Sequence, residues 1–398
     1  MFKIEKKGKS QIKSRNRIKI YSYILKNGPV SRTDLEKKLG ISAPSVSRIV
    51  ENLKKEKLIR EVGKEETSVG RKPIKLVANK DARYIVGISI TKTKIYICIT
   101  NLGADIIYRN INRLDEIESE KDLLNAIDGL ITSSLNITKI HKELILGIGI
   151  ASRGIVDYNT GTILRCYFNY YKEPIRNIKV KDFLESRYNC EVIIDNNINV
   201  ELFGKFFLSN NIKNNKKNNI LYIYMGEGVG GSIICNNELV RGKNNIAGRI
   251  SHMIVDPNGV LCNCGGKGHL EAYVSKSAIE KQYLEIKKIT DSEISIFEIC
   301  KLGNNGDEVC TDIIDDVLEK LAFAIANLQI IISPDTIILA GEIFDYYDCA
   351  LEKLNEKLQS IIFDKRLYEV ELIIRPKKDI MFDHSATALI MNKIFTVE

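Results

Sequence analysis

The sequence predicts an α/β protein with two domains, an N-terminal winged helix-turn-helix and a larger domain of two lobes. The two predicted domains differ in net charge. Residues 1–80 carry 22 Lys and Arg against 8 Asp and Glu, a net charge of +14, whereas the rest of the chain carries −6. Apolar residues recur at helical spacing in the first part, and apolar strand-like runs alternate with helices from residue 84 onward.

The pattern of the N-terminal domain, residues 1–80, predicts three short helices. The first covers residues 15–27 and stops at a Gly-Pro pair. Ser31 is a suitable cap for the second helix, and Gly40 permits the tight turn that ends it. The third helix begins after Ser42 and has a buried apolar stripe that leaves small and basic residues facing outward. This arrangement is a helix-turn-helix.

Two predicted strands, residues 58–62 and 74–77, follow the third helix and enclose a polar tip that ends in Gly70-Arg71-Lys72-Pro73. Small residues at a helix start allow close approach to base edges in a major groove, and a basic extended tip can enter a minor groove. The candidate contacts to double-stranded DNA are therefore Arg32, Ser42, Ala43, Ser45, Ser47, Arg48, Arg71 and Lys72. A merely solvated basic terminus and a protein-binding helix-turn-helix are the alternatives.

A Gly-rich segment of the second domain gathers the residue types that bind zinc. The chain has only 4 His, and two of them stand beside a closely spaced Cys pair. Two thiolates and two imidazoles match the tetrahedral preference of Zn²⁺, and four protein ligands make a structural rather than a catalytic site. The expected ligands are His252, Cys262, Cys264 and His269. The alternative is a reduced Cys pair beside an unrelated His.

The remaining Cys residues are scattered, which favours buried thiols in a reducing compartment over a disulfide framework. We find neither a signal-peptide pattern nor a run approaching the roughly 20 apolar residues of a membrane-spanning helix. We therefore expect a cytoplasmic protein without a membrane partner.

The second domain, residues 81–398, is expected to form one lobe from about 81–195 with the C-terminal helix, and another from about 196–380. A long helix is expected at about 345–362. Seven motifs follow one another along the chain: Ser31-Arg32-Thr33-Asp34-Leu35, Gly70-Arg71-Lys72-Pro73, Gly147-Ile148-Gly149, Gly154-Ile155-Val156-Asp157, Gly226-Glu227-Gly228-Val229-Gly230-Gly231, Ala247-Gly248-Arg249-Ile250-Ser251-His252 and the metal loop. In these motifs and their order, the sequence resembles the repressor branch of the ROK family, which contains bacterial repressors and sugar kinases.

This resemblance covers almost the whole chain and implies a two-lobed actin-like (ribonuclease-H-like) fold of the sugar-kinase type behind the winged helix. The zinc motif of the family has Cys where His269 stands, which still permits tetrahedral coordination. In the kinases of the family, an Asp occupies the position of Ser89 in the nucleotide loop, and the catalytic base occupies the position of Asn197. An amide cannot accept the proton of a sugar hydroxyl near neutral pH, so the resemblance implies a protein that is not an enzyme.

The resemblance also implies an effector site for a sugar or a sugar phosphate, formed by Asn196, Asn197, Arg249, His252 and Glu271. Arg249 replaces a carboxylate, and its fork of donors favours phosphate or another acceptor-rich group. The alternative is that Arg249 pairs with a local acid in a cleft that has lost its ligand. His252 can serve the metal and the effector through different ring nitrogens.

Together these features predict a DNA-binding transcriptional regulator, a repressor of carbohydrate genes that acts as a homodimer or tetramer on an operator. Symmetric dimers match symmetric half-sites. Two other functions stay open: a carbohydrate kinase with a basic appendage, and a regulator controlled by a partner protein instead of a small molecule.

Overall fold

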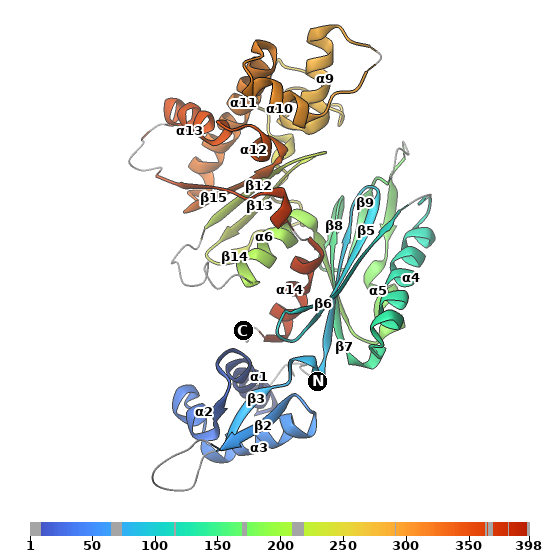
Figure 1. The fold of residues 1–398 in the computed structure, drawn as a ribbon, viewed down its shortest axis with the longest axis vertical. Coiled ribbons are helices and arrows are strands. Elements are labelled where there is room, and N and C mark those ends of the chain that lie inside the picture. The colour runs from blue at the N-terminus through green and yellow to red at the C-terminus, as the bar shows by residue number, and fades with distance from the viewer. Residues whose placement is uncertain are drawn as a thin grey trace. The chain divides into compact units, whose positions relative to one another are not determined.

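The computed structural model describes residues 9–64, 74–114, 117–168, 173–208, 219–290, 292–362, 364, 369–380 and 382–395 (Figure 1). The chain divides into two compact units. Unit 1 comprises Met1–Val200 and Phe382–Glu398, and unit 2 comprises Glu201–Met381. None of the described helices combines the length and apolar character needed to cross a membrane.

The N-terminal part of unit 1 is a winged helix. Its elements are α1 (Lys9–Asn27), β1 (Val30–Ser31), α2 (Arg32–Leu39), α3 (Ala43–Lys55), β2 (Ile59–Lys64) and β3 (Ile74–Ala78), with strand order β1-β3-β2. Ser31 caps α2 in a reciprocal box with Asp34, and Gly40 ends it with a φ of 64°. These local predictions are confirmed. The first helix begins earlier than expected, at Lys9, because polar helix-forming residues extend it beyond the apolar stripe.

The rest of unit 1 is built around a five-stranded sheet with the order β11-β7-β4-β5-β6, in which β4, β7 and β11 are parallel. The strands are β4 (Tyr84–Ile90), β5 (Lys94–Asn101), β6 (Ile106–Arg113), β7 (Ile145–Ser152) and β11 (Glu191–Asn196). A second sheet contains β8 (Ile155–Asp157), β9 (Thr162–Cys166) and β10 (Ile175–Ile178). Helices α4 (Glu120–Thr138) and α5 (Val180–Tyr188) cover one face of the large sheet, and α14 (Phe382–Phe395) packs on the other.

Glycines in the strands let α14 lie directly on this sheet. A Cβ atom at Gly149 would lie 1.9 Å from the carbonyl oxygen of Ala386, and one at Gly87 would lie 2.0 Å from that of Asp383. At the far end of α14, Phe395 stacks on Tyr21 of α1 with ring centroids 5.9 Å apart. Helix α14 therefore contacts both the large sheet and the winged helix.

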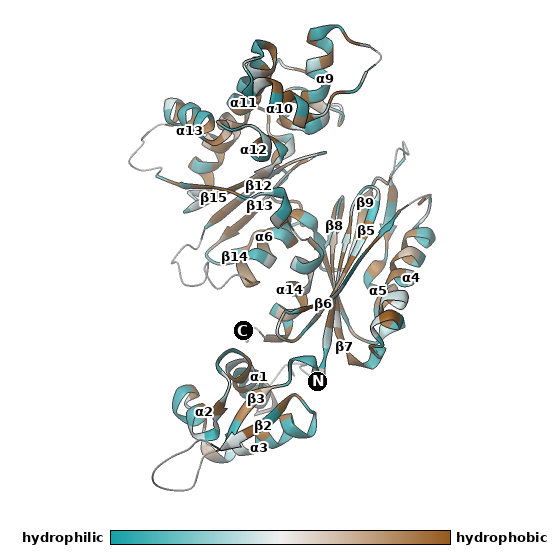
Figure 2. Cartoon of the chain, viewed as in Figure 1, coloured by the Kyte–Doolittle hydropathy of each residue, from teal (hydrophilic) through white to brown (hydrophobic). Residues whose placement is uncertain are grey.

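Unit 2 contains a second five-stranded sheet with the order β14-β13-β12-β15-β16. Its strands are β12 (Ile220–Met225), β13 (Val229–Cys235), β14 (Glu238–Leu239), β15 (Thr336–Gly341) and β16 (Glu371–Ile374). The helices are α8 (Glu271–Val274), α9 (Lys276–Lys287), α10 (Ile296–Asn304), α11 (Glu308–Ile332), α12 (Glu342–Tyr346) and α13 (Ala350–Ile361). Figure 2 shows hydrophobic residues along the strands of both large sheets and hydrophilic residues over much of the outer helices.

Two features of unit 2 differ from, or add to, the sequence prediction. The helix expected at about 345–362 is two helices, because Tyr347 has an extended backbone and its side chain is buried in the core. Glu201, which is fully buried, forms an ion pair with the nearly buried Arg375. Glu201 belongs to α6 (Asn197–Leu208), and Arg375 follows β16. Because charges lose hydration inside a protein, this pair joins two distant segments where neither charge would be stable alone.

Candidate DNA-binding, metal and ligand sites

Helix α3 presents a small, polar surface at its start. Ala43, Ser47 and Arg48 are exposed, and Ser45 is half-buried, whereas the apolar stripe faces inward. Ser42 is the N-cap residue but makes no side-chain hydrogen bond to the helix; its hydroxyl instead donates to the Ser45 oxygen at 3.1 Å. The first backbone N–H groups of α3 thus receive no cap from Ser42. N–H groups at a helix start favour anions such as phosphate.

Arg32 occupies a different environment from the one expected of a DNA contact. Its guanidinium lies 2.7 Å from the carboxylate of Glu51 on α3 and 3.5 Å from that of Glu61 on β2. These ion pairs connect α2 with α3 and with β2. A phosphate would compete with the two carboxylates for the guanidinium, and a DNA contact by Arg32 stays a prediction. Arg71 and Lys72, the other two basic residues expected to contact DNA outside α3, lie outside the described residues.

The Gly-rich segment of unit 2 folds back on itself into a compact loop. Isolated bridges pair Ile254 with His269 and Leu261 with Lys267, and the amide of Cys262 donates to the carbonyl of Gly266 at 2.8 Å. Gly268 has a φ of 66°, and a Cβ atom there would lie only 1.6 Å from the carbonyl oxygen of Asp256. This position requires glycine for both its backbone conformation and its close approach.

The folded loop brings the four expected metal ligands together. One ligand atom from each of His252, Cys262, Cys264 and His269 lies within 4.8 Å of all the others. In a tetrahedral zinc site with bonds of about 2.0–2.3 Å, ligand atoms are separated by roughly 3.3–3.8 Å, so small shifts suffice to close this set around an ion. Burial raises the pKa of the Cys262 thiol, and bound metal would compete with that proton. The residues present fit a zinc ion.

Side chains around the metal loop hold it in place. The Tyr273 hydroxyl accepts a hydrogen bond from the Val260 amide and donates one to Asp256, each at 3.1 Å. Lys320 of α11 lies 3.9 Å from the Asp256 carboxylate and 5.3 Å from the centre of the Tyr273 ring. The loop is therefore attached to the long helix in the core of unit 2.

The expected effector residues fall in both units. Asn196 and Asn197 stand at the junction of β11 and α6 in unit 1, where the side-chain amide of Asn196 donates to the Gly154 carbonyl at 3.0 Å. Arg249, His252 and Glu271 belong to unit 2. Surrounding protein lowers the pKa of Arg249, and the charge of Glu271 opposes that effect. Because the Arg249 side chain is solvent-accessible, the guanidinium keeps its proton. Glu271 is the local acid that the alternative interpretation of Arg249 requires.

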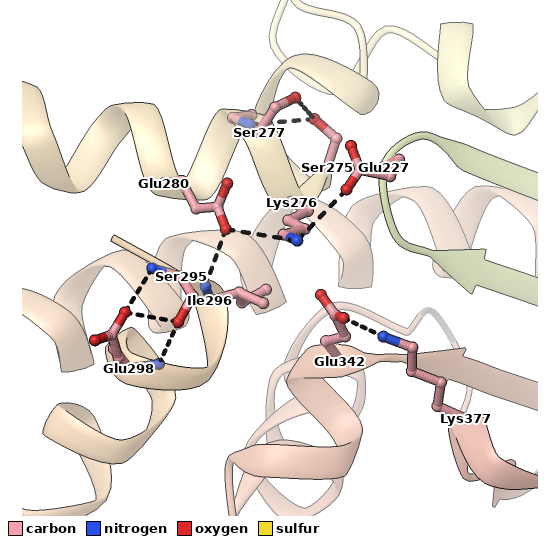
Figure 3. A network of polar contacts seen from close by, with 11 residues as sticks. Glu227, Ser275, Lys276, Ser277, Glu280, Ser295, Ile296, Glu298, Glu342 and Lys377 are labelled. Carbon is pink, nitrogen blue, oxygen red and sulfur yellow. Dashed lines mark hydrogen bonds and ion pairs between the residues drawn. The ribbon is translucent and has the colours of Figure 1, made fainter. Parts of the chain in front are cut away.

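A polar network that sequence reasoning missed surrounds the turn between β12 and β13 (Figure 3). Glu227 in this turn lies 3.4 Å from the ammonium of Lys276, and Glu342, at the start of α12, pairs with Lys377. Within the described residues, the second carboxylate oxygen of Glu342 is buried and has no hydrogen-bond partner. One sequence feature could have indicated this network: a Glu directly follows a Gly after both strands, in Gly226-Glu227 and in Gly341-Glu342.

Comparison with known proteins identifies the family of this chain. Residues 85–386 match the model of the ROK family, and residues 13–60 match a model of winged helix-turn-helix DNA-binding domains. The chain belongs to the ROK family. It is 28% identical over 381 residues to the xylose repressor of Caldicellulosiruptor bescii, covering 92% of this chain and 93% of that one. It is 27% identical over 343 residues to the dual regulator NagC of Escherichia coli, covering 83% and 81%.

Solved structures that share the fold of this ROK protein include a transcriptional regulator and a hexokinase. A ROK transcriptional regulator described as a homologue of the E. coli MLC protein has a TM-score of 0.81 at 22% identity, and covers 96% of this chain and 98% of its own. The ROK hexokinase of Thermus thermophilus has a TM-score of 0.64 at 18% identity, with 78% and 99% covered. The prediction of a winged helix followed by a sugar-kinase-type α/β domain is confirmed.

Ser89, which the resemblance placed where the kinases of the family have an Asp, is buried within β4 at 1% exposure. The following turn is closed by Thr91, whose hydroxyl donates to the carbonyl of Lys94 at 2.8 Å. Met225 and Gly341 are paired in register, so the turns that carry Glu227 and Glu342 lie at the same edge of the unit 2 sheet.

Proposed function

We propose that this ROK protein is a transcriptional repressor of carbohydrate genes that binds operator DNA through its winged helix and responds to a sugar or sugar-phosphate effector. The observation that carries the proposal is the similarity to sugar repressors over more than 90% of both chains, winged helix included. The exposed start of α3 supplies the surface that a major groove would accept. A homodimer or tetramer would present two such helices to a pseudo-palindromic site.

Arg48→Ala is expected to weaken operator binding. If Arg48 reads a base edge, the loss is about 1–3 kcal/mol at the operator; if it contacts phosphate, the salt slope of binding falls by about one. Fluorescence anisotropy at several salt concentrations distinguishes these outcomes. Lys281→Ala, which removes one exposed positive charge from α9, is the matched control and should bind as the wild type does. Equal affinity of Arg48→Ala and wild type would remove α3 from the proposed interface.

The effector would be recognised through hydroxyl-binding side chains, for which we propose Asn196, Asn197, Arg249, His252 and Glu271. Amides offer both donors and acceptors, and Glu271 can accept from two hydroxyls. A zinc ion held by His252, Cys262, Cys264 and His269 would fix the loop that carries part of this set. The effector would act by its different affinity for the DNA-binding and released states.

We expect no phosphorylation of sugars by this protein. Asn197 cannot act as general base, and Ser89 provides no carboxylate for a nucleotide-bound metal. The measurement is consumption of radiolabelled ATP by the purified chain with a panel of hexoses and pentoses. Sugar-dependent turnover would establish the alternative, a carbohydrate kinase with a DNA-binding appendage.

A further inference from the structure

We propose that the effector is a sugar bearing an anionic substituent and that Arg153 binds this substituent. This inference rests on the proposed function, because it names the chemical class of the effector and adds a residue to its site. Arg153 follows the last residue of β7 and directly precedes the motif Gly154-Ile155-Val156-Asp157. It was absent from the residues expected from the sequence, since the motif begins one position later.

The position of Arg153 is one at which α/β sheets bind ligands. Strands β4, β7 and β11 are parallel neighbours, and their carboxyl ends meet at one edge of the unit 1 sheet. The Arg153 amide donates to the carbonyl of Ile90, the last residue of β4, at 3.2 Å. Asn196, the last residue of β11, donates through its side chain to the carbonyl of Gly154, next to Arg153. Ligands of open α/β sheets bind beyond the carboxyl ends of such strands.

Within the described residues, the Arg153 guanidinium has neither an ion pair nor a hydrogen-bond partner, although its side chain is half-buried. The carboxylates of the neighbouring segments are engaged elsewhere. Asp157 accepts from the Asn159 amide at 3.0 Å and from the Thr160 hydroxyl at 2.8 Å. Asp195 is buried, and its carboxylate accepts hydrogen bonds from the backbone amide of Asn196 at 2.7 Å and from the side-chain amide of Asn199 at 3.1 Å.

The charge of Arg153 also acts on its surroundings. It opposes the effect of burial, which raises the pKa of the Cys166 thiol on β9 to about 12. A half-buried guanidinium without a counter-charge is costly to maintain, and a phosphate or carboxylate would satisfy it with two parallel hydrogen bonds. The amides of Asn196 and Asn197 stand at the same sheet edge and suit sugar hydroxyls. A fixed cation beside hydroxyl-binding amides matches an acidic or phosphorylated sugar.

The test compares neutral sugars with their anionic derivatives on the full, zinc-loaded chain. Suitable sets are glucose, glucose 6-phosphate and glucuronate, together with N-acetylglucosamine and its 6-phosphate; inorganic phosphate tests for a simple anion site. Calorimetric titration gives Kd, and release of bound operator DNA gives the functional response. We expect one anionic derivative to bind at least about tenfold more tightly than its neutral parent. Comparison of the sugar phosphates with glucuronate shows whether the site prefers a phosphate or a carboxylate.

Variants assign that preference to Arg153. Arg153→Gln should reduce binding of the anionic sugar to the level of the neutral parent, and Arg153→Lys should retain part of the difference. Arg187→Gln removes an exposed positive charge from α5 and should change neither the binding of the anionic sugar nor that of its neutral parent. Equal binding of neutral and anionic sugars by the wild type, or an unchanged preference in Arg153→Gln, would overturn the inference while leaving the proposed function intact. If operator DNA is bound but no sugar binds or releases it, the proposed sugar control fails and this inference fails with it.

Discussion

Replacing Glu201 with Gln is expected to lower the free energy of unfolding of unit 2 by about 3–5 kcal/mol, the usual result of breaking a buried ion pair. The substitution leaves the nearly buried Arg375 guanidinium without its carboxylate partner, next to the fully buried Tyr222. Denaturant unfolding followed by circular dichroism measures the effect. Glu285→Gln, which breaks the exposed ion pair with Lys281, should change stability by less than about 0.5 kcal/mol. Comparable losses in the two variants would contradict this assignment.

A double substitution separates the cost of an isolated charge from the contribution of the pair. Glu201→Leu combined with Arg375→Met removes both charges and keeps apolar volume at the site. Because neither charge is then left buried alone, most of the stability lost in Glu201→Gln should return. Failure of the double variant to recover would mean that packing, and not charge, dominates at this position.

Cys264→Ser is the second substitution expected to have a large effect. Loss of a direct ligand should lower zinc affinity by more than the roughly 10–100-fold that follows loss of a supporting hydrogen bond to a metal ligand. Because binding energy of a structural metal is also folding energy, the melting temperature of the purified chain should fall by several degrees. Zinc content by elemental analysis and thermal unfolding report the two effects.

The matched control is Cys349→Ser, because Cys349 is also exposed but lies outside the cluster. It should retain one zinc per chain and the melting temperature of the wild type. Chelation of the wild type should reproduce the behaviour of Cys264→Ser, and added zinc should reverse it. A wild-type chain purified without zinc and indifferent to its addition would contradict the metal assignment.

The sequence predicted the features that depend on local chemistry. The Ser31 cap, the Gly40 turn and the buried stripe of α3 follow from side chains within a few positions of one another. The ligand cluster was also predictable, because His and Cys are rare in this chain and stand close together in its Gly-rich loop.

The remaining features depend on contacts between distant residues. The ion pairs of Arg32 with Glu51 and Glu61 could not be predicted, because these residues approach one another only after α3 and β2 have folded. Nothing local marks Glu201 as the partner of Arg375, and Tyr347 breaks the expected helix because its ring enters the core. That Arg153 has no ion-pair partner among the described residues likewise becomes visible only when the neighbouring carboxylates are placed. These are tertiary effects that override local propensity.

The most direct test of the central claim is titration of the full, zinc-loaded chain against duplex DNA from the region upstream of its own and neighbouring genes. Fluorescence anisotropy at fixed salt, with unrelated duplex as competitor, measures specificity. The account predicts one site bound about 10³-fold or more tightly than unrelated DNA, with release on addition of a sugar or sugar phosphate. Equal affinity for all duplexes, unaffected by any sugar, would contradict it.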